Sequence, residues 1–156
     1  MTLDRGKKSV LGVAVSVIDY EATVARVVAA ARDGRPLSVS ALAVHGVMTG
    51  ALESTHKYRL NRLDIVTPDG QPVRWALRLL HGEPLADRVY GPELTRQLCA
   101  AAAAAGLSIY LFGSRLDVLE SWRIKLARDY PELVVAGYEP SRFCQLTEGE
   151  NGELDA

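Results

Sequence analysis

Several features that would restrict the function are scarce or missing in this chain of 156 residues. It contains two cysteines, Cys99 and Cys144, which are too few for a disulfide framework or a four-cysteine zinc site. No run of about 20 apolar residues is present, so the sequence predicts no membrane-spanning helix. Its 18 basic and 19 acidic side chains give a net charge of −1, whereas a dedicated nucleic-acid-binding domain usually carries a marked positive excess. We therefore expect no nucleic acid among its partners.

The common nucleotide-binding, hydrolase and metalloprotease motifs are absent as well. The sequence has no G-x-G-x-x-G, no G-x-x-x-x-G-K-[ST], no G-x-S-x-G and no H-E-x-x-H. The three histidines, His45, His56 and His81, are 11 and 25 residues apart and match no recognisable metal-ligand spacing. We predict no metal site and no cofactor.

What the chain does contain is enough apolar sequence for a core, arranged in an alternating pattern. Hydrophobic residues make up 48% and charged residues 24%, close to the averages for soluble domains. Short β-branched runs alternate with segments whose apolar residues repeat at i, i+3, i+4 and i+7, which is typical of helices. Strands are expected at residues 10–18, 37–44, 64–66, 108–112 and 133–136, with helices at about 20–33, 45–60 in two pieces, 72–81, 91–105 and 115–129.

This alternation predicts βαβ units and therefore an α/β fold with a mostly parallel sheet. We expect one domain over residues 1–140 and an acidic, flexible tail over 141–156. Ligands of such folds bind beyond the carboxyl ends of the strands. The loops at 44–46, 67–71 and 113–115 are therefore the places to look for a site.

The loop at residues 67–71, Thr-Pro-Asp-Gly-Gln, is the most informative of the three. It follows a predicted strand and precedes a predicted helix, so Asp69 should lie at the ligand edge of the sheet near a helix N-terminus. A carboxylate in that place can take a proton from a substrate hydroxyl, and Gln71 is a candidate binding residue beside it. Pro-Asp-Gly is also ordinary β-turn sequence, so a plain turn is the alternative.

Arg88 and Gly91 form a second candidate region. Gly91 and Pro92 are predicted to open a helix, and Arg88 lies just before it. Helix N-termini bind anions, and an arginine nearby can add paired hydrogen bonds to a phosphate. The alternative is that Arg88 pairs with Asp87 or Glu93 on the surface.

Two further loops supply weaker candidates. Gly113 and Ser114 lie where a strand ends and a helix begins, and their backbone N–H groups are suited to a nucleotide phosphate or ribose; a tight turn is the alternative. His45, after the second predicted strand, either contacts the substrate or is a solvated loop histidine. Cys99 lies in an alanine-rich helix and is expected in the core.

The order of these segments is similar to that of one known family. The chain carries, in sequence, G-V-A-V, V-x-A-L-A-V-H-G, R-L-N, D-I-V-T-P-D-G-Q-P-V-R-W-A, D-R-V-Y-G-P-E-L, G-L-S-I-Y-L-F-G-S and Y-P-E-L. Together they resemble the WecB/TagA/CpsF glycosyltransferase family from about Leu11 to Tyr138. The P-D-G followed by W-A, and the R-V-x-G-x-x-L about twenty residues later, are specific in combination.

The resemblance implies a Rossmann-like α/β fold, with helices on both faces of a mostly parallel sheet, and the function of a sugar transferase. The reaction it implies moves a sugar of the N-acetylhexosamine class from a UDP-sugar to an acceptor hydroxyl, often of a lipid-linked saccharide, in cell-surface polysaccharide or glycolipid assembly. Family members invert the anomeric centre without a metal. The family's proposed base matches Asp69, and the arginine of its R-V-x-G motif matches Arg88. The implied location is the cytoplasm, or the inner face of the membrane as a peripheral protein.

Two departures from the family pattern leave alternatives open. Many relatives carry a Thr and an Asn after the second strand, where this chain reads Ala-Leu-Ala-Val-His at residues 41–45. Relatives also continue into a further strand–helix unit and a basic appendage, which we expect this chain to lack. Such a loss would uncover part of the sheet, so we expect self-association into a homo-oligomer. The competing hypotheses are a truncated, non-catalytic relative that binds a nucleotide-sugar or a partner, and another nucleotide-binding α/β protein.

Overall fold

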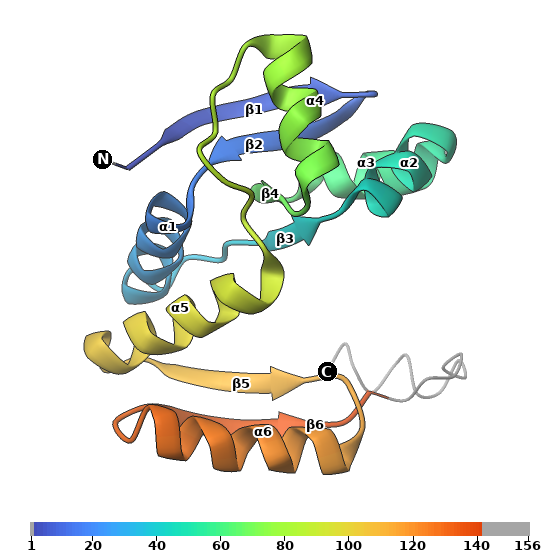
Figure 1. Cartoon of the computed structure of the whole chain (residues 1–156). Coiled ribbons are helices and arrows are strands. Elements are labelled where there is room, and N and C mark those ends of the chain that lie inside the picture. The colour runs from blue at the N-terminus through green and yellow to red at the C-terminus, as the bar shows by residue number, and fades with distance from the viewer. Residues whose placement is uncertain (1, 142–156) are drawn as a thin grey trace.

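The computed structural model describes residues 2–141 and has six helices and six strands in that range. Backbone hydrogen bonds join the strands in three pairs, of which two are parallel and one is antiparallel. The predicted α/β class is confirmed (Figure 1). The predicted tail, residues 141–156, lies outside the described residues apart from Ser141. No helix in the described part is long and apolar enough to cross a membrane.

The N-terminal pair is an antiparallel hairpin of β1 (Asp4–Val10) and β2 (Val13–Ile18). Leu11 and Gly12 form the turn, with φ of 53° and 85°, and two consecutive positive φ values suit the twist of a hairpin. The single strand predicted over residues 10–18 is therefore wrong, because the turn divides it. The strand β1 escaped prediction because its side chains are mostly exposed and charged, as is common for a strand at a sheet edge.

The second pair is parallel and consists of β3 (Val39–Leu42) and β4 (Ile65–Pro68). All four residues of β4 are buried, which is typical of a strand covered on both faces. The backbone N–H of Val66 in β4 donates to Oγ of Ser16 in β2 at 3.0 Å. The two pairs therefore lie side by side in the order β1–β2–β4–β3 (Figure 1).

The third pair is also parallel and consists of β5 (Ser108–Phe112) and β6 (Val134–Glu139). In Figure 1 it lies beyond α5, and the arrows of β3 and β5 point the same way. Tyr110 is opposite Gly137, where a Cβ would lie only 2.7 Å from Cε2 of the Tyr110 ring. Glycine at this position therefore permits the close packing of the two strands.

Six helices connect the strands: α1 (Tyr20–Arg32), α2 (Val44–Leu52), α3 (Ser54–Arg62), α4 (Gln71–His81), α5 (Gly91–Ala105) and α6 (Leu116–Asp129). Asp19 caps α1, since its side chain accepts a hydrogen bond from the N–H of Ala22 at 2.8 Å. The predicted helix ends at residues 81 and 105 are confirmed. Gly82 after α4 and Gly106 after α5 have φ of 67° and 66°, the left-handed conformation that ends many helices.

The core divides into a larger part around β2 and β4 and a smaller part between β5, β6 and the helices α5 and α6. In the larger part Val13, Val15 and Val17 are fully buried. The other face of the β5–β6 pair is open, because Tyr110, Phe112 and Val134 are 57%, 71% and 59% exposed. This face is therefore exposed among residues 2–141, and its origin in a missing strand–helix unit stays a prediction.

Candidate functional site

The first element of the candidate site is Asp69, directly after β4. Its backbone N–H donates to the carbonyl of Leu42 at the end of β3, at 3.2 Å. Its carboxylate oxygen Oδ2 accepts from the backbone N–H of Gly91, the first residue of α5, also at 3.2 Å. Asp69 therefore connects the carboxyl ends of two parallel strands with the start of a helix far along the chain.

Gly91 occupies the tightest part of this junction. A Cβ at Gly91 would lie 3.3 Å from Cβ of Ala41 and 3.6 Å from Oδ2 of Asp69. Both distances show that the backbone of α5 approaches β3 and the carboxylate closely. Gly91, which was predicted to begin a helix, therefore also sets the separation between Asp69 and α5.

Three helices, α2, α4 and α5, begin directly after or close to these strand ends. The residues that precede them, Ala43, Gly70 and Tyr90, make no side-chain hydrogen bond to their own helix. The first-turn N–H groups of a helix carry a partial positive charge and lack partners within the helix. At α5 the carboxylate of Asp69 supplies one acceptor, and the arrangement as a whole favours an anionic ligand.

The segment from Gly82 to Tyr90, which leads to α5, is fixed at several points. The buried carboxylate of Glu83 pairs with Arg5 at 3.0 Å and with Lys8 at 3.8 Å. Nε of Arg74 donates to the carbonyl of Leu85 at 2.7 Å. These bonds hold the segment against the N-terminal hairpin and α4, so its later residues have a defined path to the site.

The last residues of this segment are held by β4 and α1. The N–H of Val89 donates to the carbonyl of Pro68 at 3.0 Å, and the N–H of Tyr90 donates to the hydroxyl of Tyr20 at 2.7 Å. The Arg88 guanidinium lies 4.9 Å from the centre of the Tyr90 ring, within the range of a cation–π interaction. The Tyr90 ring therefore positions Arg88, and the Tyr20 hydroxyl holds the backbone of Tyr90. The role of Tyr20 was not predicted, because it depends on a contact between segments 70 residues apart.

The alternative for Arg88, a surface ion pair with Asp87 or Glu93, is not formed within residues 2–141. The Asp87 carboxylate accepts from the backbone N–H of Arg88 at 2.7 Å. Glu93 instead pairs with Arg96 at 2.8 Å and accepts from Gln97 at 2.8 Å; these hydrogen bonds lower the pKa of Glu93 from its ordinary value near 4.5 to about 2. Within residues 2–141 the guanidinium of Arg88 has no carboxylate partner, so it is available to an anionic ligand.

The remaining predicted residues lie after strand ends, and no hydrogen bond joins them to the Asp69 side chain within residues 2–141. Oε1 of Gln71 accepts from Arg74 at 3.1 Å. His45 is exposed in the first turn of α2. Gly113 and Ser114 form the turn after β5 with φ of 103° and 61°, and their backbone groups bond residues 139 and 141. Their roles in binding stay predictions.

No group of three or more His, Cys, Asp or Glu side chains that could hold a metal ion occurs among the described residues. What the geometry joins is a carboxylate, a helix N-terminus and, on the adjoining segment, an arginine. This set can accept a proton and stabilise negative charge.

Comparison with known proteins gives this arrangement a context. The model of the glycosyl transferase WecG/TagA/CpsF family matches residues 8–154. An N-acetylglucosaminyldiphosphoundecaprenol N-acetyl-beta-D-mannosaminyltransferase of Bacillus subtilis (strain 168) is 29% identical over 79 residues, which are 51% of this chain and 30% of that protein. The similar region thus spans less than a third of that relative's length. Since the family match covers nearly the whole chain, this chain belongs to the WecG/TagA/CpsF family of glycosyl transferases.

Proposed function

We propose that this chain transfers a sugar of the N-acetylhexosamine class from a UDP-sugar to an acceptor hydroxyl, with inversion at the anomeric carbon and without a metal. The observation that carries the proposal is the carboxylate of Asp69 at the N-terminus of α5, in a chain of a glycosyl transferase family. The name of the Bacillus subtilis relative, which specifies an N-acetylmannosaminyl transfer to a lipid diphosphate saccharide, supports the same class of donor and acceptor.

In this proposal Asp69 is the general base. Its Oδ2 is held by the N–H of Gly91, which leaves Oδ1 to accept the proton of the acceptor hydroxyl. The acceptor oxygen forms its bond to the anomeric carbon as the bond from that carbon to the UDP oxygen breaks. Attack from the face opposite the leaving group inverts the anomeric centre. The proton moves to Asp69 in concert with the formation of the new bond.

The leaving diphosphate gains negative charge in this step. We assign its stabilisation to the guanidinium of Arg88 and to first-turn N–H groups of the helices that begin at the strand ends. Arg88 suits this role because no carboxylate within residues 2–141 neutralises it and the Tyr90 ring restricts its position. Gln71, His45, Gly113 and Ser114 are further candidates for contacts to the sugar, ribose or phosphate, since each follows the carboxyl end of a parallel strand.

A panel of nucleotide-sugars tests this proposal. Thermal unfolding of the full chain is measured with UDP, UDP-N-acetylglucosamine, UDP-N-acetylmannosamine, UDP-glucose and GDP-mannose, because a ligand that binds the folded state raises its stability. UDP release is then followed with a saccharide acceptor present. Stabilisation by a UDP-sugar with acceptor-dependent UDP release is the expected result. Stabilisation without release would favour a non-catalytic binding protein, and no stabilisation by any UDP compound would contradict the proposal.

A further inference from the structure

Four consecutive backbone N–H groups lead into α5, and all four are engaged. They donate as follows: Arg88 to the Asp87 carboxylate, Val89 to the carbonyl of Pro68, Tyr90 to the Tyr20 hydroxyl and Gly91 to the Asp69 carboxylate. Pro92 comes next and has no N–H. The guanidinium of Arg88 is therefore the charged donor that this stretch can offer to an anionic ligand, and its position matters for binding.

Arg88 and Tyr90 lie on the same side of an extended stretch of backbone. The side chain of Val89, between them, is only 1% exposed, so it points into the core and its two neighbours point the other way. This places the Arg88 guanidinium 4.9 Å from the centre of the Tyr90 ring, where the contact is favourable. The direction of the Tyr90 ring therefore restricts where the guanidinium can lie.

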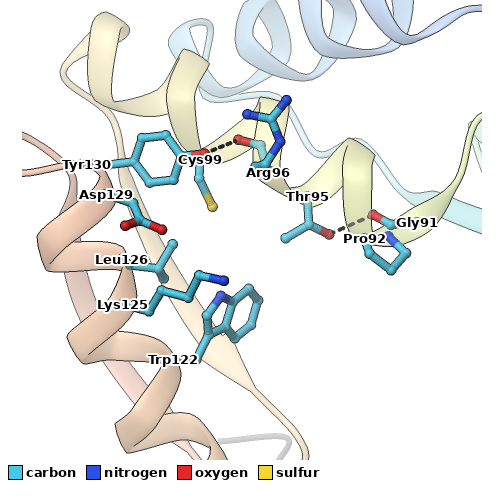
Figure 2. Close-up of a pocket in the computed structure, with 10 residues that line it drawn as sticks. All are labelled: Gly91, Pro92, Thr95, Arg96, Cys99, Trp122, Lys125, Leu126, Asp129 and Tyr130. Atoms are coloured by element: carbon cyan, nitrogen blue, oxygen red, sulfur yellow. Dashed lines mark hydrogen bonds between the residues drawn. The ribbon is translucent and has the colours of Figure 1, made fainter.

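The backbone of Tyr90 is held on its C-terminal side by α5. Its carbonyl accepts from the N–H of Leu94 at 2.9 Å, as in a regular helix. Gly91 and Pro92 line a groove of about 600 Å³ between α5 and α6, where Oγ1 of Thr95 donates to the carbonyl of Gly91 at 3.0 Å (Figure 2). The helix thus fixes the carbonyl of Tyr90, while the N–H of Tyr90 depends on Tyr20.

Tyr20 is well placed to hold that N–H, because its own backbone is fixed. It is the first residue of α1 and follows the cap Asp19, whose carbonyl accepts from Oγ1 of the fully buried Thr23 at 2.7 Å. A hollow of about 440 Å³ lies between α1 and the chain at residues 84–89, and Tyr20 lines it. Because packing is incomplete there, the hydrogen bond of the Tyr20 hydroxyl has a larger part in holding Tyr90.

From these contacts we infer that Tyr20 is a positioning residue for the diphosphate of the nucleotide-sugar, and that it acts through Tyr90 on Arg88. The inference rests on the proposed transferase function, which gives Arg88 the diphosphate as its ligand. Tyr20 does not touch the reacting atoms in this scheme. Its hydroxyl holds the backbone of Tyr90, the Tyr90 ring holds the guanidinium, and the guanidinium meets the charge that the leaving UDP gains.

Binding of UDP and of uridine to the full chain, measured by calorimetry, tests this inference. Tyr20→Phe keeps the ring and removes the acceptor, so it should weaken UDP binding by about 3- to 10-fold, as for one ordinary hydrogen bond, and leave uridine binding unchanged. Tyr90→Leu should weaken UDP binding similarly, whereas Tyr90→Phe, which keeps the ring, should not. Unchanged UDP affinity in Tyr20→Phe, or equal weakening for UDP and uridine, would overturn the inference.

The control for a lost tyrosine hydroxyl is Tyr58→Phe. Tyr58 in α3 also accepts a hydrogen bond at 2.7 Å, from Arg62, and the Arg62 guanidinium lies 5.5 Å from the centre of its ring. The same kind of change is thus made at a pair outside the candidate site. Tyr58→Phe should bind UDP as the unaltered chain does, and a loss equal to that of Tyr20→Phe would contradict a specific role of Tyr20.

A double variant distinguishes positioning of Arg88 from a general structural effect. If Tyr20 acts through Arg88, its replacement has nothing left to disturb once the guanidinium is gone. Arg88→Ala and the combined variant with Tyr20→Phe should therefore bind UDP equally, and a further 3- to 10-fold loss in the combined variant would overturn the inference. In Tyr20→Phe the KM for the nucleotide-sugar should rise, and the KM for the acceptor should stay the same.

The position of Arg88 can also be measured without a nucleotide. In an NMR spectrum of the arginine Nε–H groups, the signal that Arg88→Lys removes belongs to Arg88, and the ring current of Tyr90 shifts it. We expect Tyr90→Leu and Tyr20→Phe both to move this signal, and Tyr58→Phe to leave it in place. An Arg88 signal that Tyr20→Phe does not move would overturn the inference.

These measurements separate the inference from the proposed function. If UDP-sugars are bound and transferred but Tyr20→Phe changes neither UDP affinity nor the Arg88 signal, the inference is wrong and the transferase proposal stands. If no UDP compound binds, the transferase proposal and the diphosphate contact are wrong, and the NMR signal still decides whether Tyr20 positions Arg88.

Discussion

Replacing Asp69 should separate its structural role from its chemical role, because the two depend on different properties of the side chain. The structural role is to accept from the N–H of Gly91 at the start of α5. Asp69→Asn keeps an oxygen that accepts this bond and loses only the charge at the helix N-terminus, which is worth about 0.3–1 kcal/mol. Asp69→Ala loses the acceptor altogether and should lower the free energy of unfolding by about 1–2 kcal/mol.

The chemical role of Asp69 predicts a similar loss of transfer rate in the two variants, unlike their effects on stability. Neither asparagine nor alanine accepts the acceptor proton, so both variants should lower the transfer rate by roughly 10²-fold or more, which corresponds to about 2.7 kcal/mol in the barrier. UDP affinity should change little. The expected pattern is therefore a large, similar loss of transfer in both variants and a clear loss of stability only in Asp69→Ala.

Three measurements on one set of proteins check this pattern: urea unfolding, UDP binding, and UDP release with an acceptor. One kcal/mol corresponds to about 2–4 °C in the midpoint of thermal unfolding for a domain of this size, so the stability difference is measurable. Asp33→Asn is the control, because Asp33 is an exposed carboxylate after α1 that pairs with Arg35. If Asp69→Asn transfers at nearly the unaltered rate, Asp69 is a turn residue and the proposed mechanism is wrong.

Three further predictions follow from the described contacts. Arg88→Ala should weaken the binding of UDP by about 1.5–3 kcal/mol and the binding of uridine much less, as measured by calorimetry. Equal weakening for both ligands would contradict a phosphate contact. Since the folded pKa of Glu93 is about 2, below its ordinary value, Glu93 stabilises the fold above about pH 4.5 and this contribution disappears as the pH falls toward 2. Between pH 5 and pH 2 the free energy of unfolding, measured with urea, should fall less for Glu93→Gln than for the unaltered chain. An identical fall in both proteins would contradict this role of Glu93. The exposed ring of Phe112 should promote self-association, so sedimentation across a dilution series should show less association for Phe112→Ser, and a monomer at every concentration in both would exclude this face as an interface.

Much of the fold could be predicted from local sequence, because the signals are local. The left-handed glycines Gly82 and Gly106 end their helices where the pattern placed the ends, and Asp19 caps α1 through a bond three residues away. The position of Asp69 after a strand and before a helix was also readable, since a Pro-Asp-Gly turn has its own signature. The strand β1 was not predicted, because an exposed and charged edge strand lacks the apolar alternation by which strands are recognised.

The sequence by itself therefore determined the α/β class, the boundaries of most helices, the family, and Asp69 and Arg88 as candidates. The tertiary structure alone decided which distant segments meet. It brought the Asp69 carboxylate to the N–H of Gly91 and the Tyr20 hydroxyl to the N–H of Tyr90. It also paired Glu93 with Arg96, so that Glu93 does not pair with Arg88. It also formed the groove between α5 and α6. Such contacts cannot be read from local patterns, because they depend on how helices and strands far apart in the chain pack against one another, and that packing is set by the whole core.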